Sequence, residues 1–356
     1  MSQRLSSKKT AFVFSGGASL GAIEVGALKA VIEEGIQADM VLGTSVGSLN
    51  GALYAYNPTL EGVEVMERIW RQIKTSKVFP ISPIKPVLNF TTAGHYLVSS
   101  KNLRNLIIQN LPYTRIEETT LPLYIICTDI KSGQEIIFNK GLVLEALLAS
   151  AGIPAVFPPL SMHERFLVDG GVVNNAPIST AVRLGAKRVV VFPIGLPPAN
   201  QEPKNYLQIL IRSLIYLLNR QLASDIQLYK DTVELIIVPP PTTLEIKPHD
   251  FSASSTLVDE GYKVTKAWLQ KEGFTPNADT CPQPCDVFCQ PIHFLEAIEP
   301  EPEKSTLVRV KENIKLTAES LKDALAEKAE KLSVDVADTA EKIKEKVFKK
   351  RSEDTP

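Results

Sequence analysis

Histidine is scarce in this chain, with only four among its 356 residues. They are His95, His163, His249 and His293. Histidine is the most frequent general base in enzymes, and it must lie within hydrogen-bond reach of the group that it deprotonates. A catalytic site in this chain therefore has few histidines available to it, and His95 and His163 read most simply as ordinary loop residues.

An excess of one charge and a long hydrophobic run are also missing. Lysine and arginine number 39 against 40 aspartates and glutamates, so nothing argues for a nucleic-acid partner. No stretch approaches the roughly 18 uncharged apolar residues of a transmembrane helix. The first residues are polar and basic, and the apolar run at 11–14 is too short for the core of a signal peptide. We therefore expect a cytoplasmic protein whose thiols stay reduced.

The chain does contain a pentapeptide, residues 43–47, that reads G-T-S-V-G. It follows an apolar run at 40–42 and precedes a helix-compatible run at 46–56, which is the strand–turn–helix context of a nucleophile elbow. The positive end of the new helix would point at Ser45, where an oxyanion would form. The small residues that let the backbone turn tightly here are Gly43 and Gly47.

A glycine-rich loop at residues 16–21, which reads G-G-A-S-L-G, joins an expected strand to an expected helix. Such a loop presents open backbone N–H groups to a phosphate or an oxyanion. A dinucleotide fingerprint is the weaker interpretation, because the third loop position is alanine and no acidic residue ends a second strand. Asp39 lies near the required distance but begins the strand that leads into the elbow. We expect no cofactor, and an oxyanion hole formed by Gly16, Gly17, Ala18 and Gly21.

An Asp-Gly-Gly sequence follows the expected strand at 165–168. An aspartate at a strand end, with Gly170 and Gly171 behind it, can approach a serine closely enough to act as its base. Asp-Gly is also a common turn dipeptide, which is the alternative. The elbow and the glycine-rich loop favour the first interpretation, with Asp169 as the proton acceptor for Ser45.

These three motifs, in this order, resemble those of the patatin-like phospholipase family. The resemblance runs from about residue 9 to residue 269 and includes the segment 147–159. It implies a Ser–Asp dyad without histidine, on a three-layer α/β/α fold, that hydrolyses acyl esters of lipids. Ala18 and Leu20 depart from the family's commonest loop, which has a glycine and a basic residue there. Alanine still leaves its amide open, whereas losing the basic residue removes one electrostatic contribution.

A Ser-His-Asp triad is the alternative to the dyad. Such enzymes run serine, acid, histidine along the chain, so His249 or His293 could serve by order. Those enzymes also build several strands before the elbow, and here only one strand precedes the strand that leads into it. The dyad is therefore the prediction.

Strands and helices alternate along the chain, which predicts a three-layer α/β/α sandwich with a mostly parallel central sheet. Strands are expected at 10–14, 40–42, 123–128, 134–138, 165–168, 188–193 and 235–238. Helices are expected at 22–34, 46–56, 61–74, 103–110, 142–150, 178–184, 206–230 and 255–271. The helix at 206–230 is unusually apolar. It could be a lipid-facing lid, but all-round apolar helices are usually buried, so we expect it to cover the sheet.

The chain divides into a short extension (1–8), a catalytic domain (9–275), a linker rich in proline and cysteine (276–302) and a helical tail (303–356). In the linker, Cys281, Cys285, Cys289 and His293 recur at every fourth residue. This is a ligand set of the Cys₃His type, but the intervening prolines prevent one helix face and the spacing fits zinc sites only loosely. Free thiols without a metal are the prediction.

Apolar residues in the tail repeat with a step of 11 residues, for example at Leu321 and Leu332. Eleven residues make three helical turns, so the stripe stays on one face of a nearly straight helix. Either residues 305–350 attach reversibly to a lipid surface, or the helix is solvated or packs on another copy. Catalysis at lipid surfaces favours attachment slightly.

The sequence therefore predicts a lipid acyl hydrolase in the cytoplasm, with reversible contact at a membrane surface. Ser45 attacks the ester carbonyl after Asp169 removes its proton, and water then releases the acyl group. An acyltransferase that uses the same dyad and a non-catalytic lipid-binding protein are the alternatives.

Overall fold

The computed structural model describes residues 8–78, 98–194, 202–203, 206–241 and 250–277. All of them belong to the first of two compact units, Met1–Gln290. The second unit, Pro291–Pro356, lies outside the described residues, as do the cysteines of the linker and the apolar stripe of the tail.

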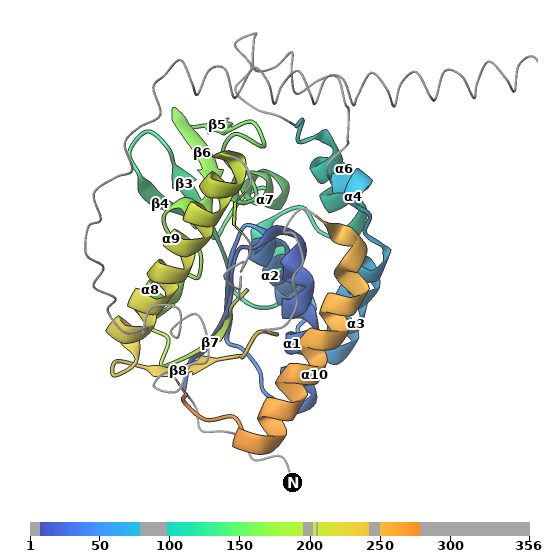
Figure 1. The fold of residues 1–356 in the computed structure, drawn as a ribbon, viewed down its shortest axis with the longest axis vertical. Coiled ribbons are helices and arrows are strands. Elements are labelled where there is room, and N and C mark those ends of the chain that lie inside the picture. Colours follow the sequence, from blue (N-terminus) through green and yellow to red (C-terminus); the bar gives the residue numbers. More distant parts are fainter. Residues whose placement is uncertain (1–7, 79–97, 195–201, 204–205, 242–249, 278–356) are drawn as a thin grey trace, which may run out of the picture. The chain divides into compact units, whose positions relative to one another are not determined.

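An eight-stranded sheet forms the centre of the described part (Figure 1). Its order is β5-β6-β3-β2-β1-β7-β8, and β4 pairs with β3 off this path. The strands are β1 (Thr10–Phe14), β2 (Met40–Thr44), β3 (Leu123–Asp129), β4 (Gln134–Phe138), β5 (Leu160–Met162), β6 (Arg165–Asp169), β7 (Arg188–Phe192) and β8 (Glu234–Ile237).

The prediction of a mostly parallel sheet is confirmed. Strands β3, β2, β1, β7 and β8 run parallel, whereas β4 and β6 are antiparallel to β3, and β5 is antiparallel to β6. The sequence missed β5, which has only three residues and therefore too short a pattern to recognise.

Two strands meet end to end along one edge of β3. β2 pairs with the first part of β3, up to Thr44 opposite Ile126, and runs parallel to it. β6 pairs with the last part, beginning with Asp169 opposite Cys127, and runs antiparallel. Because β4 pairs with the other edge over both parts, β2 and β6 share an edge, and their carboxyl ends meet at neighbouring positions of β3. The residues that follow Thr44 and end β6 are thereby brought together.

Helices cover both faces of this sheet. They are α1 (Gly21–Glu33), α2 (Val46–Tyr56), α3 (Leu60–Gln72), α4 (Thr75–Val78), α6 (Lys101–Asn110), α7 (Val143–Ser150), α8 (Ile178–Arg183), α9 (Tyr206–Tyr229) and α10 (Ser254–Glu272). Alternate residues of β1 point to opposite faces, so Phe12 and Phe14 join the core with α1 and α2, whereas Ala11 and Val13 join the core with α8 and α9. In Figure 1, α8 and α9 lie on one side of β7, and α1, α3 and α10 lie on the other. The predicted three-layer sandwich is confirmed.

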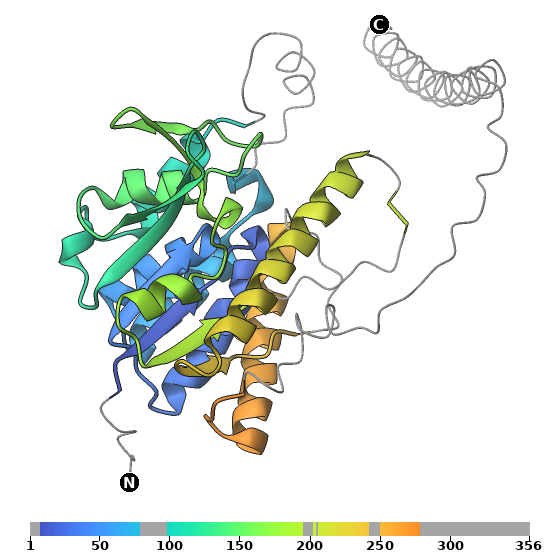
Figure 2. The same ribbon diagram turned by 90° about the vertical axis from the view of Figure 1, so that its left-hand side faces the viewer.

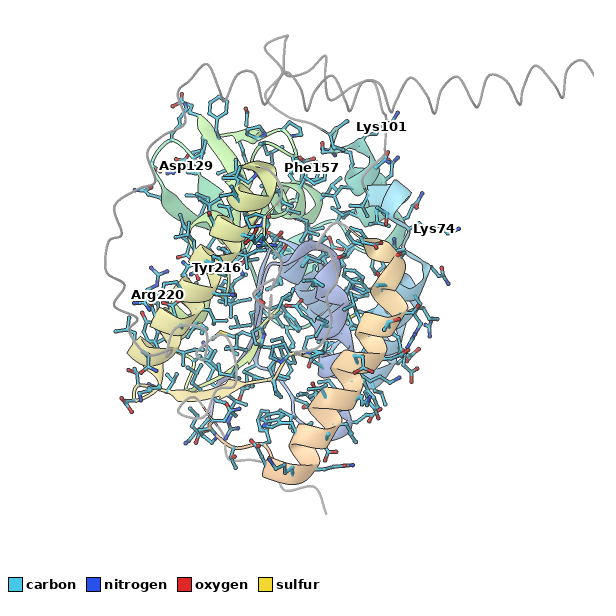
Figure 3. All side chains as sticks on the ribbon, viewed as in Figure 1. Lys74, Lys101, Asp129, Phe157, Tyr216 and Arg220 are labelled. Atoms are coloured by element: carbon cyan, nitrogen blue, oxygen red, sulfur yellow. The ribbon has the colours of Figure 1, made fainter. Side chains whose placement is uncertain are left out.

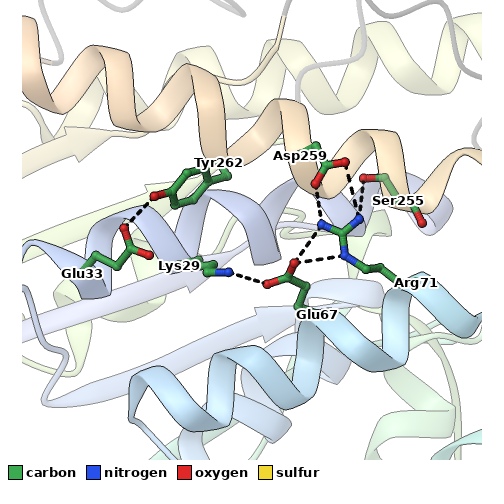
Figure 4. A network of polar contacts seen from close by, with 7 residues as sticks. All are labelled: Lys29, Glu33, Glu67, Arg71, Ser255, Asp259 and Tyr262. Atoms are coloured by element: carbon green, nitrogen blue, oxygen red, sulfur yellow. Dashed lines mark hydrogen bonds and ion pairs between the residues drawn. The ribbon is translucent and has the colours of Figure 1, made fainter.

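Helices α1 and α10 cross in close contact. A Cβ atom at Gly26 would collide with the backbone carbonyl of Val258, and one at Gly261 would collide with that of Ile23. Beside this crossing, Arg71 of α3 pairs with both Glu67 and Asp259, as Figure 4 shows. The ion pairs connect α3 to α10, so the layer behind the glycine-rich loop is held by backbone contact and by charge.

The prediction of a buried helix at 206–230 is wrong for its first half. In α9, Leu222, Ala223 and Ile226 pack against the sheet, whereas Leu210 and Leu217 are exposed. An apolar composition on all sides gives no signal for which half of a helix has a partner, and here only the second half has one among the described residues.

Candidate active site

Ser45 sits on a strained turn between β2 and α2. Its backbone has φ 55° and ψ −127°, a left-handed conformation that non-glycine residues rarely adopt. The flanking glycines are needed for close approach: a Cβ at Gly43 would collide with the carbonyl of Gly47, and one at Gly47 with the carbonyl of Phe14. This strand–turn–helix geometry is that of a nucleophile elbow.

The Ser45 side chain lies directly against Asp169. Its Oγ donates a hydrogen bond of 2.6 Å to Asp169 Oδ2, and the other carboxylate oxygen, Oδ1, accepts one of 2.8 Å from the amide of Gly171. Burial raises the pKa of Asp169 to about 6, against the lowering effect of these two hydrogen bonds. A carboxylate with a pKa in that range is mostly ionised at neutral pH, yet basic enough to accept a proton.

Hydrogen bonds to the backbone fix Asp169 at the end of β6. Its amide donates to the carbonyl of Gly152 at 2.9 Å, and its carbonyl accepts from Thr128 Oγ1 at 2.9 Å. A Cβ at Gly170 would collide with the carbonyl of Ile126 in β3. The first glycine after the aspartate is therefore required by close packing.

The glycine-rich loop lies beside the elbow, but only part of it can hold an oxyanion. The amide of Gly16 donates to the carbonyl of Asn175 at 3.2 Å, and the amide of Gly21 is bonded inside the loop's own helical turn. No hydrogen bond between described residues uses the amides of Gly17 and Ala18. The structure thereby corrects the predicted set of four donors, and two candidates remain.

Ala18 stands at a position that favours glycine. Its φ is 53°, which explains why the family's commonest loop has a glycine there. The preceding Gly17 is needed for another reason, since a Cβ there would lie 2.7 Å from Ile194 Cδ1. The loop is thus held by packing against the chain that follows β7.

Ser150, at the end of α7, is a site residue that the sequence did not single out. Its Oγ accepts a 2.9 Å hydrogen bond from the amide of Ser45 and donates one of 2.6 Å to the carbonyl of Ile126. It therefore connects the backbone of Ser45 to β3. Its place in the family-like segment at 147–159 was the only available signal.

A second buried polar cluster, also missed, connects the loop to the helices. Glu24 Oε1 accepts from the amide of Ser15 at 2.8 Å, and Oε2 accepts from Asn50 Nδ2 at 2.8 Å. Asn50 also donates to the carbonyl of Gly21 at 2.9 Å and accepts from Trp70 Nε1 at 2.8 Å. Burial raises the pKa of Glu24 well above its usual value. A single acid in an otherwise apolar helix start was the sequence signal.

An apolar pocket opens beside Ser45. Aliphatic and aromatic side chains from α2, α3, α6 and the segment after α7 line it, among them Leu53, Ile69, Leu103 and Phe157. Phe157 is labelled beside α7 in Figure 3. A pocket of this composition suits a hydrocarbon chain, because burying apolar surface is favourable without specific partners.

No histidine among the described residues takes part in this geometry. His163 lies in the turn between β5 and β6, at the end of β6 opposite to Asp169. The other three histidines lie outside the described residues. Within the described ranges no cluster of His, Cys, Asp or Glu could hold a metal ion, and none of the helices there is long and apolar enough to cross a membrane.

Part of this chain is similar in sequence to known proteins. A family model described as patatin-like phospholipase matches residues 12–182. Rat patatin-like phospholipase domain-containing protein 7 is 30% identical over 193 residues, which cover 54% of this chain and 14% of that protein. Lysophospholipase NTE1 of Mycosarcoma maydis is 28% identical over 203 residues, which cover 55% of this chain and 10% of that protein. Among solved structures, VipD from Legionella pneumophila has a TM-score of 0.41 at 14% identity, over 74% of this chain and 67% of that one.

The chain thus matches only a small part of the two relatives found by sequence, 14% and 10% of their length. The matched span contains part of β1, strands β2 to β6, the glycine-rich loop, the elbow and the Asp-Gly-Gly segment described above. Residues 12–182 of this chain belong to the patatin-like phospholipase family.

Proposed function

We propose that this protein is a lipid acyl hydrolase that works through a Ser45–Asp169 dyad. The observation that carries the proposal is the 2.6 Å hydrogen bond from Ser45 Oγ to Asp169 Oδ2. Ser45 also lines an apolar pocket that suits an acyl chain. The family and the relative named as a lysophospholipase support a lipid ester as substrate.

In the proposed reaction, Asp169 takes the hydroxyl proton while Ser45 Oγ attacks the ester carbonyl carbon. The carbonyl oxygen becomes an oxyanion, which the amides of Gly17 and Ala18 stabilise together with the N-terminal end of α2. The intermediate collapses, the alcohol leaves with the proton from Asp169, and the acyl group stays on Ser45. Water, deprotonated by the same carboxylate, then attacks the acyl-enzyme and releases the fatty acid.

A serine-directed fluorophosphonate tests the nucleophile. The expected result is one covalent adduct per chain, located at Ser45 by mass spectrometry and absent from Ser45→Ala. Ser48→Ala is the matched control, because Ser48 lies one turn away and donates its hydroxyl to the Ser45 carbonyl. No adduct on the folded protein would favour a non-catalytic lipid-binding protein.

A panel of phospho-, galacto- and neutral lipids then identifies the substrate class. Release of free fatty acid without an added acceptor supports hydrolysis. Product that forms only with an alcohol acceptor would identify an acyltransferase instead. The cytoplasmic location and the lipid contact of residues 305–350 stay predictions.

A further inference from the structure

The first half of α9 exposes a row of large apolar side chains. Leu210 is 55% exposed, Leu214 52% and Leu217 65%, and these three lie on one face at steps of four and three residues. Ile209 and Tyr216 are exposed beside them. We call these five residues the α9 apolar face. In Figure 2, the first turns of this yellow-green helix extend past the ribbons of the other described elements.

The charge on this part of α9 has one sign. From Tyr206 to Ser224 the helix contains no acidic residue, and its two charged residues are Arg212 and Arg220. Tyr216 and Arg220 are labelled on it in Figure 3. The first carboxylate, Asp225, comes where the helix already packs on the sheet with Leu222 and Ile226.

The same helix contacts the catalytic loops directly. Gln221 Nε2 donates to the carbonyl of Val173, and Gln221 Oε1 accepts from the amide of Asn175 at 3.4 Å. Asn175 in turn donates through Nδ2 to the carbonyl of Gly16, at 3.2 Å, in the glycine-rich loop. One turn of helix therefore separates the α9 apolar face from a residue that braces both the Asp169 loop and the oxyanion loop.

We propose that the α9 apolar face docks the enzyme on the surface of its aggregated lipid substrate. Exposed leucines with an aromatic residue and arginines, and with no acid, are typical of a helix that lies in a membrane interface. Lipid phosphates complement Arg212 and Arg220, whereas a second copy packed on this face would bring arginines against arginines. Docking there holds the active site at the lipid surface, because Gln221 fixes the helix to the catalytic loops. This inference rests on the proposed function for the identity of the substrate.

The test measures binding of the full-length Ser45→Ala protein to vesicles of phosphatidylcholine with about one third phosphatidylglycerol. Leu214→Gln with Leu217→Gln removes apolar surface without adding charge and keeps good helix formers. We expect binding at least about tenfold weaker, since burial of two half-exposed leucines in lipid is lost. Leu228→Gln is the matched control, because Leu228 is on the same helix and also 65% exposed, but lies beyond the packed segment. It should bind as the parent does.

Several outcomes would overturn the docking surface. One is unchanged binding of the double variant while Leu321→Glu with Leu332→Glu abolishes it, which would assign docking to the tail. Another is an equal loss in Leu228→Gln, and a third is a parent dimer that the double variant dissociates in sedimentation velocity. Unchanged thermal unfolding excludes loss of the fold as the cause. Because Ser45→Ala is inactive by design, failure of the proposed hydrolysis would appear separately, as an absence of ester turnover in the Ser45 protein.

Discussion

Two buried carboxyl groups, those of Asp169 and Glu24, differ in the hydrogen bonds that they accept. Asp169 and Glu24 are 7% and 1% exposed, and burial raises the pKa of both. Asp169 accepts one hydrogen bond from the hydroxyl of Ser45. The two 2.8 Å hydrogen bonds that Glu24 accepts come from N–H groups of Ser15 and Asn50, and the neighbouring Ser15 hydroxyl donates its proton to the carbonyl of Phe192.

The kind of group that donates to each carboxylate determines the role that we expect for it. A hydroxyl can give up its proton to a carboxylate as it attacks a carbonyl, whereas a peptide or carboxamide N–H cannot do so near neutral pH. We therefore expect similar burial to serve a general base at Asp169 and a positioning group at Glu24. Glu24 fixes the start of the glycine-rich loop through Ser15, and through Asn50 it connects that loop to α2.

The largest expected effect separates the two roles. Asp169→Asn removes the proton acceptor, so we expect kcat to fall about a thousandfold or more, as Ser45→Ala does, and the double variant to lose little further. Glu24→Gln leaves the dyad intact and should lower kcat by about tenfold with KM nearly unchanged, through a displaced oxyanion loop. Steady-state kinetics with a soluble short-chain ester measure both. Near-normal turnover in Asp169→Asn, with loss in His249→Ala or His293→Ala, would replace the dyad with a triad.

A substitution at Gly17 has the next largest expected effect on kcat. This residue lies on the loop that Glu24 positions. Valine at Gly17 would bring its side chain against Ile194 and turn the amide away, at a loss of about a hundredfold in kcat. Ile194→Ala makes room for that side chain and should restore part of the activity in the double variant. A folded Gly17→Val protein with full activity would place the oxyanion hole elsewhere.

The local parts of this site were predictable from the sequence, because each depends on neighbours in the chain. The elbow needs small residues two positions before and after Ser45, and the loop needs small residues between a strand and a helix, so spacing alone identified both. Which loop amides remain open was not predictable, because the amide of Gly16 donates to the carbonyl of Asn175, 159 residues away in the chain.

The non-local parts depend on the sheet. The meeting of β2 and β6 on one edge of β3 follows from strand pairing, which has no sequence signature here. Ser150 reaches Ser45 across 105 residues for the same reason. Side-chain exposure on α9 was mispredicted because it depends on which half of the helix meets the sheet.

The third expected effect is a fall in kcat/KM at acidic pH. With the pKa of Asp169 at about 6, kcat/KM should be flat at neutral pH and fall about tenfold per unit below that value, since the base must be ionised to accept a proton. Glu24 touches no reacting atom, so its titration should add no comparable limb. A profile that stays flat to pH 4.5, with the protein folded, would contradict Asp169 as the base.

The smallest expected effect is on the free energy of unfolding. We expect Asp169→Asn to raise it at high pH and Glu24→Gln not to. The raised pKa means that folded Asp169 holds its proton more tightly than the unfolded chain, so its contribution to stability is present below about pH 4 and is lost as pH rises through about 6. Asp169→Asn removes the cost of burying an ionised carboxylate at high pH. The Ser45 hydroxyl can rotate to accept a hydrogen bond from the new amide. We expect its free energy of unfolding at pH 8 to exceed that of the parent by roughly 1–3 kcal/mol.

Glu24→Gln should show no such gain in the free energy of unfolding. The new carboxamide NH₂ would face either the amide of Ser15 or Nδ2 of Asn50, and neither of these donors can become an acceptor. A buried donor left without a partner costs about 1–3 kcal/mol. Urea unfolding of both variants at pH 5 and pH 8 measures the difference, with the gain of Asp169→Asn over the parent larger at the higher pH. If Asp169→Asn were destabilised at pH 8, its charge would be stabilising the fold, and catalysis would not be the reason for burying it. If Glu24→Gln gained as much as Asp169→Asn, the two sites would differ in position alone, and the identity of the hydrogen-bond donor would not set their roles.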